Sequence, residues 1–277
     1  MTSWRNGAPK VAFVSGGGSG IGLSIVRALI SEGASIAIFD LNIDEVLLCE
    51  LRSRCSRREQ RVEPYVVDIT NPLAVDSAMD SAVKTLGRPD FAFNSAGILR
   101  TGVFTELPYE TFELVIRINL LGSRNFASAA LKQMEAGGHL ALVSSLSGFV
   151  GSYSQAAYAA SKFGVVGLAE VLRVEQKLQG IDVSVVCPGE IETPLLAYER
   201  RHGSPITESM NAFAGVMPVD LAVAGILDGL KARQWIITPG FKAKLTRAMS
   251  RKATSLFHWL IDQRLAKTVA AHQEKRA

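Results

Sequence analysis

The stretch Ser15-Gly16-Gly17-Gly18-Ser19-Gly20-Ile21-Gly22 decides the fold, because it joins a short apolar run at residues 11–15 to a helical pattern at 20–32. Glycines at such a junction permit a tight turn and let the backbone approach a pyrophosphate closely. They also aim the N–H groups of the following helix at that anion. The stretch predicts a dinucleotide-binding turn between a strand and a helix. The alternative is a plain structural turn.

The rest of the chain alternates short apolar runs with segments of helical length, a pattern typical of parallel strands joined by crossover helices. Most of the apolar runs lack polar alternation, as in Ile36-Ala37-Ile38-Phe39, which suits a sheet covered on both faces. The expected strands are 11–15, 35–40, 62–68, 91–94, 139–144, 182–187 and 235–238. The expected helices are 20–32, 42–57, 71–86, 109–135, 156–179, 218–231 and 241–265. We therefore expect an α/β protein with a Rossmann-like, doubly wound, mainly parallel sheet of seven strands and helices on both faces.

Residues 1–277 are expected to form a single domain in which two segments stand out. Residues 192–217 are rich in proline and glycine and fit neither period, so they predict an irregular lid over a ligand site, with a plain surface loop as the alternative. Residues 241–265 repeat apolar side chains at helical spacing between lysines and arginines. Such a basic amphipathic helix packs on its own core or a neighbouring subunit, makes peripheral contact with a membrane, or captures an acidic or lipid-like substrate.

Composition excludes several classes of protein. The formal charge of +4 is unevenly distributed, because the chain from Lys231 onward holds eleven Lys or Arg and two Asp or Glu. No nucleic-acid-binding motif accompanies this charge, so no nucleic-acid partner is expected. The three cysteines show no metal-ligand spacing, no apolar stretch approaches the length of a membrane span, and residues 1–10 lack a signal-peptide core. We expect a cytoplasmic protein with reduced thiols and no bound metal.

Asp40 closes the second expected strand, about twenty residues after the glycine turn. A carboxylate at this point accepts hydrogen bonds from both ribose hydroxyls of NAD, and its charge repels the 2′-phosphate of NADP. The neighbouring Ser19 and Leu41 are neutral and offer that phosphate no cation. The position predicts a preference for NAD(H). The alternative is that Asp40 only caps the following helix.

Tyr158 and Lys162 lie four residues apart, hence on one face of the helix expected at 156–179. A nearby ammonium favours the anionic form of a phenol, which suits Tyr158 to general acid or base work. Ser145 follows the strand expected at 139–144, at the sheet edge where ligands bind, and Asn119 lies in the long helix expected at 109–135. The alternative explanation of the Tyr-Lys spacing is an ordinary amphipathic face.

Together these residues make the chain resemble the short-chain dehydrogenase/reductases over nearly all of residues 10–240. The resemblance implies a catalytic tetrad of Asn119, Ser145, Tyr158 and Lys162. It also implies cofactor contacts by Gly16, Gly18, Ser19, Gly20, Ile21, Gly22, Asp40, Leu41, Asp68, Ile69, Asn94, Ala96, Gly97, Tyr158, Lys162, Pro188, Gly189, Ile191 and Thr193. Two positions depart from the family pattern: Ser15 replaces a usual Thr, and Ser95 replaces a second Asn, which removes one side-chain hydrogen bond.

By the same resemblance, Tyr158 would transfer the proton, Ser145 would polarise the substrate oxygen, Lys162 would bind the ribose and lower the pKa of Tyr158, and Asn119 would fix a water. Asp68 would hold the adenine amino group. The expected reaction transfers a hydride between NAD(H) and a secondary alcohol or ketone of apolar, long-chain or steroid-like character. The substrate pocket is expected to consist of Leu146, Phe149, Tyr153, Leu195, Leu196, Tyr198 and Phe213, with Arg100 able to read an acidic group.

Two other functions stay open at this point. One is a 3-oxoacyl thioester reductase, against which Asp40 weighs because such enzymes commonly use NADPH. The other is a non-catalytic NAD(H)-binding sensor or scaffold, whose usual mark, a broken tetrad, is missing here. The family resemblance also implies a homo-oligomer, either a tetramer or a dimer.

Overall fold

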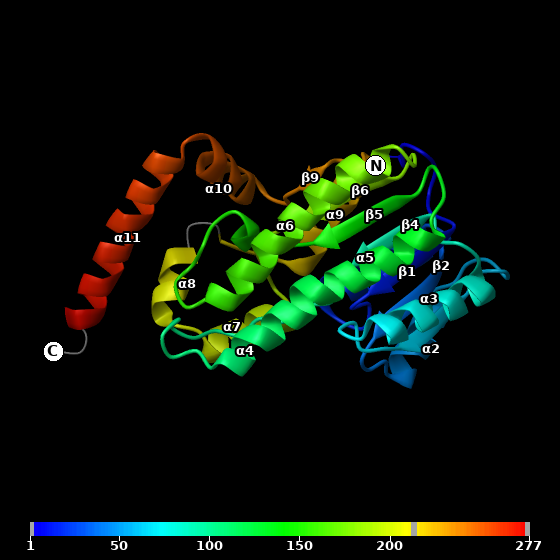
Figure 1. Ribbon diagram of the computed structural model, residues 1–277, viewed down its shortest axis with the longest axis horizontal. Coiled ribbons are helices and arrows are strands. Elements are labelled where there is room, and N and C mark those ends of the chain that lie inside the picture. The colour runs from blue at the N-terminus through cyan, green and yellow to red at the C-terminus, as the bar shows by residue number, and fades with distance from the viewer. Residues whose placement is uncertain (1–2, 212–214, 275–277) are drawn as a thin grey trace.

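A parallel sheet of seven strands, in the order β3-β2-β1-β4-β5-β6-β9, forms the centre of the computed structural model, which describes residues 3–211 and 215–274, with side chains to residue 270 (Figure 1). The strands are β1 (Val11–Ser15), β2 (Ser35–Asp40), β3 (Val62–Val66), β4 (Phe91–Asn94), β5 (His139–Val143), β6 (Asp182–Val186) and β9 (Ile236–Ile237). The chain winds outward from β1 in one direction and from β4 in the other. The strand order therefore reverses between β1 and β4, where such sheets bind ligands. The predicted doubly wound fold is confirmed.

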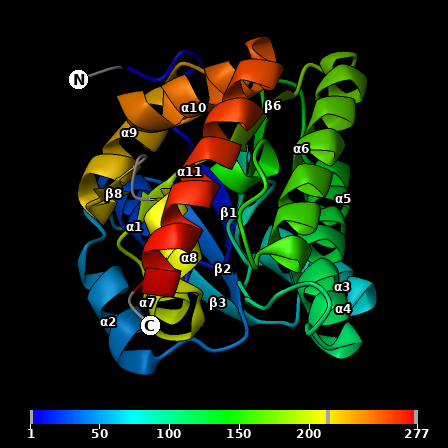
Figure 2. The ribbon, with the colours of Figure 1, turned by 90° about the vertical axis from the view of Figure 1, so that its left-hand side faces the viewer.

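Two layers of helices cover the sheet, and each layer buries its own apolar core. Phe126 of α5 and Val165 of α6 pack on one face, whereas Val26 of α1 and Ile226 of α9 pack on the other. Figure 2 shows α5 and α6 on one side of the strands and α1 and α9 on the opposite side. The helices of these layers are α1 (Gly20–Ser31), α2 (Glu45–Ser53), α3 (Pro72–Leu86), α4 (Tyr109–Ile116), α5 (Gly122–Gln133), α6 (Ala156–Lys177) and α9 (Val219–Lys231). Burial on both faces explains why the strands are apolar throughout.

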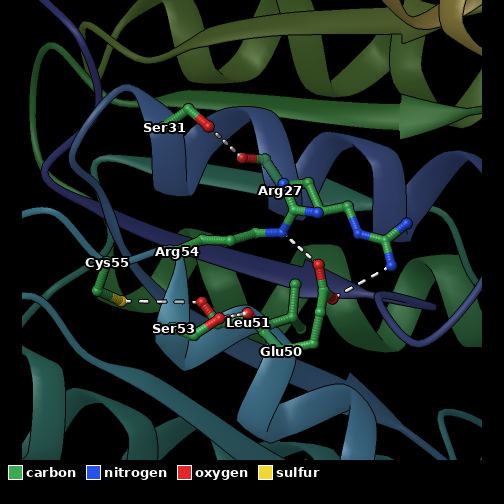
Figure 3. A network of polar contacts seen from close by, with 7 residues as sticks. All are labelled: Arg27, Ser31, Glu50, Leu51, Ser53, Arg54 and Cys55. Carbon is green, nitrogen blue, oxygen red and sulfur yellow. Dashed lines mark hydrogen bonds and ion pairs between the residues drawn. The ribbon is translucent and has the colours of Figure 1, made fainter.

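Helix α1, which starts at the glycine turn, is tied to α2 by a three-membered ion network (Figure 3). Arg27 of α1 approaches Glu50 of α2 at 3.2 Å, and Arg54 binds the other carboxylate oxygen. Burial opposes the charge of Glu50, but hydrogen bonds and attraction from the two guanidinium groups outweigh it and lower its pKa. All three side chains are partly exposed, so each pair contributes under about 1 kcal/mol. The network mainly fixes how α1 lies against α2.

The long helix expected at 109–135 is interrupted. Between α4 and α5 the backbone forms a π-helical turn, η1 (Arg117–Leu121), with Asn119 at its middle. Such turns insert an extra residue per turn and often occur at functional sites. Here the turn rotates Asn119 inward, where it is fully buried.

The segment 192–217 was expected to be an irregular lid, but its backbone is largely helical, and its role as a lid stays a prediction. It contains two short helices, α7 (Pro194–His202) and α8 (Pro205–Asn211), each of which begins at a proline. Proline is favoured in the first helical turn because its missing N–H has no intrahelical partner there. A parallel two-stranded ladder, β7 (Glu190–Ile191) with β8 (Val216–Met217), joins the two ends of the segment.

The basic segment predicted as one helix at 241–265 forms two helices, α10 (Phe241–Lys252) and α11 (Thr254–Glu274). They meet at Ala253, whose φ of −134° and ψ of 49° lie outside the helical region. Figures 1 and 2 show α11 away from the sheet and beside α8. Among the described residues, no helix is long and apolar enough to cross a membrane.

Candidate active site

A cavity of about 1080 Å³ lies at the carboxyl edge of the sheet. Its walls include the ends of β1 and β2 at Ser15 and Asp40, the loop after β4 at Ser95, and the end of β5 at Val143. The cavity is therefore at the point where the strand order reverses, the usual ligand site of this architecture.

The glycine turn forms one end of this cavity. Gly16 and Gly20 have φ of +65° and +52°, which residues with a side chain rarely adopt, and α1 begins at Gly20. A Cβ atom on Gly22 would overlap the carbonyl oxygen of Gly16, so only glycine permits the turn to fold back onto its helix. The first turn of α1 carries no acidic residue. Its N–H groups and positive dipole end therefore face the cavity free to receive an anion such as a pyrophosphate.

Asp40 lies beside this turn and accepts hydrogen bonds from the backbone N–H groups of Gly18 at 2.9 Å and Leu41 at 2.8 Å. The alternative role as a helix cap is wrong, because Asp44 caps α2 through the N–H of Val46. Asp40 lines the cavity and is partly exposed there. It can therefore accept hydrogen bonds from a ribose while two peptide dipoles stabilise its charge.

Most of the predicted cofactor residues share the cavity wall. They are Gly16, Ser19, Gly20, Ile21, Asp40, Leu41, Asp68, Ile69, Ala96, Gly97, Tyr158, Lys162, Pro188, Gly189, Ile191 and Thr193. Gly18, Gly22 and Asn94 are not on that wall. Asn94 is fully buried, accepts a hydrogen bond from the hydroxyl of Ser15 and donates one to Ser123 at 2.7 Å. It joins β1, β4 and α5 behind the site.

Asn119 also lies behind the cavity wall. Its Oδ1 accepts from the N–H of Ile98 at 2.8 Å, and its Nδ2 donates to the carbonyl of Ile98 at 2.9 Å and to Ser161 Oγ at 3.0 Å. Both amide hydrogens are thus used within the chain. Asn119 therefore fixes the loop after β4 against α6, and its expected role in holding a water stays a prediction.

Ser145, Tyr158 and Lys162 meet in the cavity. Ser145 follows β5 and caps the short helix η2 (Leu146–Gly148), and its side chain is hydrogen-bonded to Tyr158. Lys162 Nζ donates to the carbonyl oxygen of Val143 at 3.0 Å and lies 5.6 Å from the centre of the Tyr158 ring. Tyr158 and Lys162 are 7% and 5% exposed, so the hydroxyl and the ammonium share a largely water-free site.

The protonation of this group differs from what the sequence suggested. Burial raises the pKa of Tyr158 to about 12, although the hydrogen bond from Ser145 lowers it, and the carboxylate of Glu199 raises it further. Burial also lowers the pKa of Lys162 to about 8. Desolvation is thus the largest influence on the pKa of both groups, and the expected lowering of the Tyr158 pKa by Lys162 with the cofactor bound stays a prediction.

The wall beyond Tyr158 is partly apolar. Leu146, Leu195, Leu196 and Tyr198 line it as expected, and the guanidinium of Arg100 stacks on the Tyr198 ring at 4.7 Å. Phe149 and Tyr153 do not reach the cavity, and the predicted Phe213 lies outside the described residues.

Sequence reasoning missed two carboxylates and one amide in this region. Glu199 of α7 accepts a hydrogen bond from Gln155, the residue that precedes α6, and Glu190 of β7 lines the same wall. Burial raises the pKa of both carboxyls, and the charge of Glu190 raises that of Glu199 further. The sequence does place Glu199 at helical spacing from Leu195 and Leu196. This spacing indicates a shared face only if the segment is known to be a helix.

Fold and site together define a nicotinamide-type oxidoreductase: a doubly wound sheet, a glycine turn opening a helix, and a Ser-Tyr-Lys group at its carboxyl edge. Residues 10–203 match the model of the short chain dehydrogenase family. The chain belongs to that family, which binds nicotinamide cofactors.

Two curated relatives and one solved structure illustrate the likeness. The oxidoreductase UcpA of Salmonella typhimurium is 33% identical over 199 residues, which cover 71% of this chain and 74% of UcpA. The probable oxidoreductase EphD of Mycobacterium tuberculosis is 34% identical over 187 residues, 66% of this chain, but the match spans only 31% of EphD. The 3-oxoacyl-(acyl-carrier protein) reductase of Brucella melitensis, in complex with NAD, superposes with a TM-score of 0.74 at 26% identity, covering 85% of this chain and 98% of the other.

Proposed function

We propose that this protein interconverts a secondary alcohol and a ketone with NAD(H). One observation carries the proposal: the hydroxyls of Ser145 and Tyr158 share one cavity with Lys162, the glycine turn and Asp40. A dinucleotide laid along the carboxyl edge from the turn toward β5 would place its reactive end beside these hydroxyls.

The cavity fits such a cofactor on its own chemistry. The free N–H groups at the start of α1 suit the pyrophosphate, Asp40 suits the ribose next to adenine, and Lys162 suits the ribose next to nicotinamide. Asp68 accepts from the N–H of Thr70 at 2.8 Å and keeps its other oxygen for the adenine amino group. Ile191 and Thr193 line the wall where the carboxamide would lie. The bound nicotinamide supplies or accepts the hydride.

The chain's own residues handle the proton and the developing charge. Ser145 Oγ donates a hydrogen bond to the substrate oxygen and stabilises it as negative charge grows there. In reduction, Tyr158 donates its phenolic proton to that oxygen. In oxidation, the Tyr158 phenolate removes the hydroxyl proton of the alcohol, and the Lys162 ammonium stabilises that phenolate across the ring. The raised pKa of Tyr158 suits the acid role, and therefore reduction, at neutral pH.

A preference for NAD(H) over NADP(H) rests on Asp40. Its carboxylate is held by two N–H groups, so the charge stays at the place where a 2′-phosphate would sit. No lysine or arginine flanks it at positions 19 or 41 to offset that repulsion.

A second candidate is reduction of a 3-oxoacyl thioester. The observation that favours it is the likeness to the Brucella melitensis reductase, whose complex contains NAD, so that Asp40 does not weigh against such a substrate. A panel of acetoacetyl thioesters, aliphatic ketones and steroid ketones, assayed with NADH and NADPH, separates the two. A catalytically silent scaffold is disfavoured because Ser145, Tyr158 and Lys162 are all present and in one cavity.

The decisive variant is Tyr158→Phe, which removes only the phenolic oxygen. We expect turnover of every active ketone to fall by about a thousandfold or more, with NADH affinity nearly unchanged. Tyr109→Phe is the matched control, because Tyr109 is 73% exposed and outside the cavity. Ketone reduction at the wild-type rate by Tyr158→Phe would show that the proton comes from elsewhere.

A further inference from the structure

The C-terminal helices form part of the same cavity as Tyr158, although they follow the region that matches the family model, residues 10–203. From α10 the wall receives Thr246 and Met249. From α11 it receives Phe257, Leu260, Ile261, Gln263, Arg264 and Lys267. The substrate side of the cavity is therefore closed by a segment outside the region that the family model matches.

Helix α11 is held in this place by contacts with α8. The guanidinium of Arg264 donates to the carbonyl oxygen of Ser209 at 3.2 and 2.7 Å, and the hydroxyls of Ser209 and Thr268 are 3.1 Å apart. Phe257 is buried at the start of the same helix face. Figure 2 shows α11 crossing beside α8, which these contacts explain. These hydrogen bonds and the burial of Phe257 join α11 to α8 and to the cavity.

Half of the residues that α10 and α11 contribute to this wall are apolar. Met249, Phe257, Leu260 and Ile261 face the cavity, which Leu195 and Leu196 of α7 also line. An apolar substrate body would exclude water from both walls at once, which favours its binding. The volume of the cavity, about 1080 Å³ including the cofactor region, leaves room for more than a small ketone.

Charge is distributed unequally along this cavity. The carboxylates Glu190 and Glu199 lie on the lid side, and Glu199 acts electrostatically on Tyr158. Arg264 and Lys267, one helical turn apart, lie on the α11 side. Arg100, a further cation that lines the cavity, is engaged with the Tyr198 ring and the carbonyl of Leu99.

The cations of α11 are available to a ligand. Within the described part of the chain, no lysine or arginine of α10 or α11 forms a salt bridge. Arg264 uses Nε and Nη2 on Ser209 and keeps its remaining N–H groups. At the Tyr158 end the negative charge of Glu199 offsets the ammonium of Lys162, which already donates to the carbonyl oxygen of Val143. The α11 end has two cations without a salt-bridge partner among the described residues, so an anionic group is attracted more strongly to that end.

We propose that α10 and α11 form a specificity subsite for substrates with a long apolar body and an anionic terminus such as a carboxylate, which Arg264 and Lys267 bind while the carbinol carbon lies at Tyr158. This proposal rests on the function proposed above. It narrows the apolar substrate class to amphiphiles of one orientation, with the reacting group at the acidic end of the cavity and the charged group at the basic end.

The test compares a long-chain oxo fatty acid with its methyl ester in the full-length protein. Lys267→Glu is the informative variant because Arg264 also anchors α11 and its replacement would disturb the wall. Lys252→Glu is the matched control, because Lys252 is exposed on α10 and does not line the cavity. We expect the wild type to prefer the acid over the ester in kcat/KM. Lys267→Glu should reduce that preference by about tenfold, and Lys252→Glu should not.

A binding measurement separates this subsite from the reaction itself. Fluorescent cis-parinaric acid and its methyl ester are titrated into the NADH-bound protein, with and without the Lys267→Glu change. The subsite is supported if the wild type binds the acid more tightly than the ester and Lys267→Glu abolishes that difference. This result would stand even if no ketone is reduced, and then only the proposed function would fail. Equal affinity for acid and ester in the wild type, or equal effects of Lys267→Glu and Lys252→Glu, would overturn the subsite while leaving the ketone reductase intact.

Discussion

Replacing Asp40 by Asn tests the cofactor preference with the smallest change of shape. The carboxylate of Asp40 accepts from the N–H groups of Gly18 and Leu41, and its charge faces the cavity. Asn keeps one acceptor oxygen and replaces the other by an NH2 group. The variant therefore loses the charge and leaves one of these two backbone N–H groups without its acceptor.

The magnitudes follow from these contacts. A hydrogen bond to a charged acceptor is about 1 kcal/mol stronger than one to a neutral acceptor, so NADH should bind about fivefold more weakly. Removing a unit charge about 5 Å from a phosphate in a partly exposed site removes roughly 1–3 kcal/mol of repulsion, so NADPH should bind about fivefold to 150-fold more tightly. The Asn oxygen can keep the half-buried N–H of Gly18 while water satisfies the exposed N–H of Leu41, so the free energy of unfolding should fall by no more than about 1 kcal/mol.

Fluorescence titration of NADH and NADPH against both proteins measures the two affinities, and thermal unfolding measures the stability. Asp44→Asn is the control, because Asp44 caps α2 on the surface and Asn caps helices equally well. The reasoning is refuted if the wild type binds NADPH more tightly than NADH. It is also refuted if Asp40→Asn changes the affinity for NADPH no more than Asp44→Asn does.

Two further outcomes test the proton chemistry and the glycine turn. The charge of Glu199 raises the pKa of Tyr158, so Glu199→Gln should lower that pKa and shift the pH at which alcohol oxidation accelerates to lower values; an unshifted pH profile of kcat/KM counts against this electrostatic link. Gly22→Ala should lower the free energy of unfolding by about 3 kcal/mol, because the added methyl overlaps the carbonyl of Gly16. Gly167→Ala in α6 is the control: its methyl meets open space, so the free energy of unfolding should stay unchanged or rise by up to about 1 kcal/mol. Equal denaturation midpoints for the two variants would contradict the packing argument.

The sheet was predictable because its strands are fully buried. An apolar run such as Phe91–Asn94, bounded by a proline-aspartate pair and by Ser95, has few alternatives to a strand in a covered parallel sheet. The position of Ser145 followed from the same regularity, since the carboxyl ends of parallel strands share one edge, whereas Tyr158 was assigned from its spacing to Lys162 and from the family resemblance. Strand ends were less certain, and the expected 62–68 stops at Val66 because the chain turns outward after it.

The predictions that were wrong concerned residues whose local sequence is compatible with more than one structure. Pro194 and Pro205 contributed to the expectation of an irregular segment at 192–217. Each instead stands in the first turn of a helix, where proline is favoured. The inward rotation of Asn119 depends on a π-helical turn that no spacing rule announces. The pKa of Tyr158 could not be foreseen, because burial depends on the whole cavity and not on the distance to Lys162 along one helix.

The ladder of β7 and β8 has a consequence for how this enzyme can change over evolutionary time. Because Glu190 pairs with Val216 and Ile191 with Met217, the two ends of the segment that contains α7 and α8 lie side by side. Insertions and deletions between these strands would alter what the enzyme recognises while the sheet and its hydroxyl pair stay in register. The segment between β7 and β8 is thus a suitable unit to exchange between relatives when substrate specificity is to be changed in the laboratory.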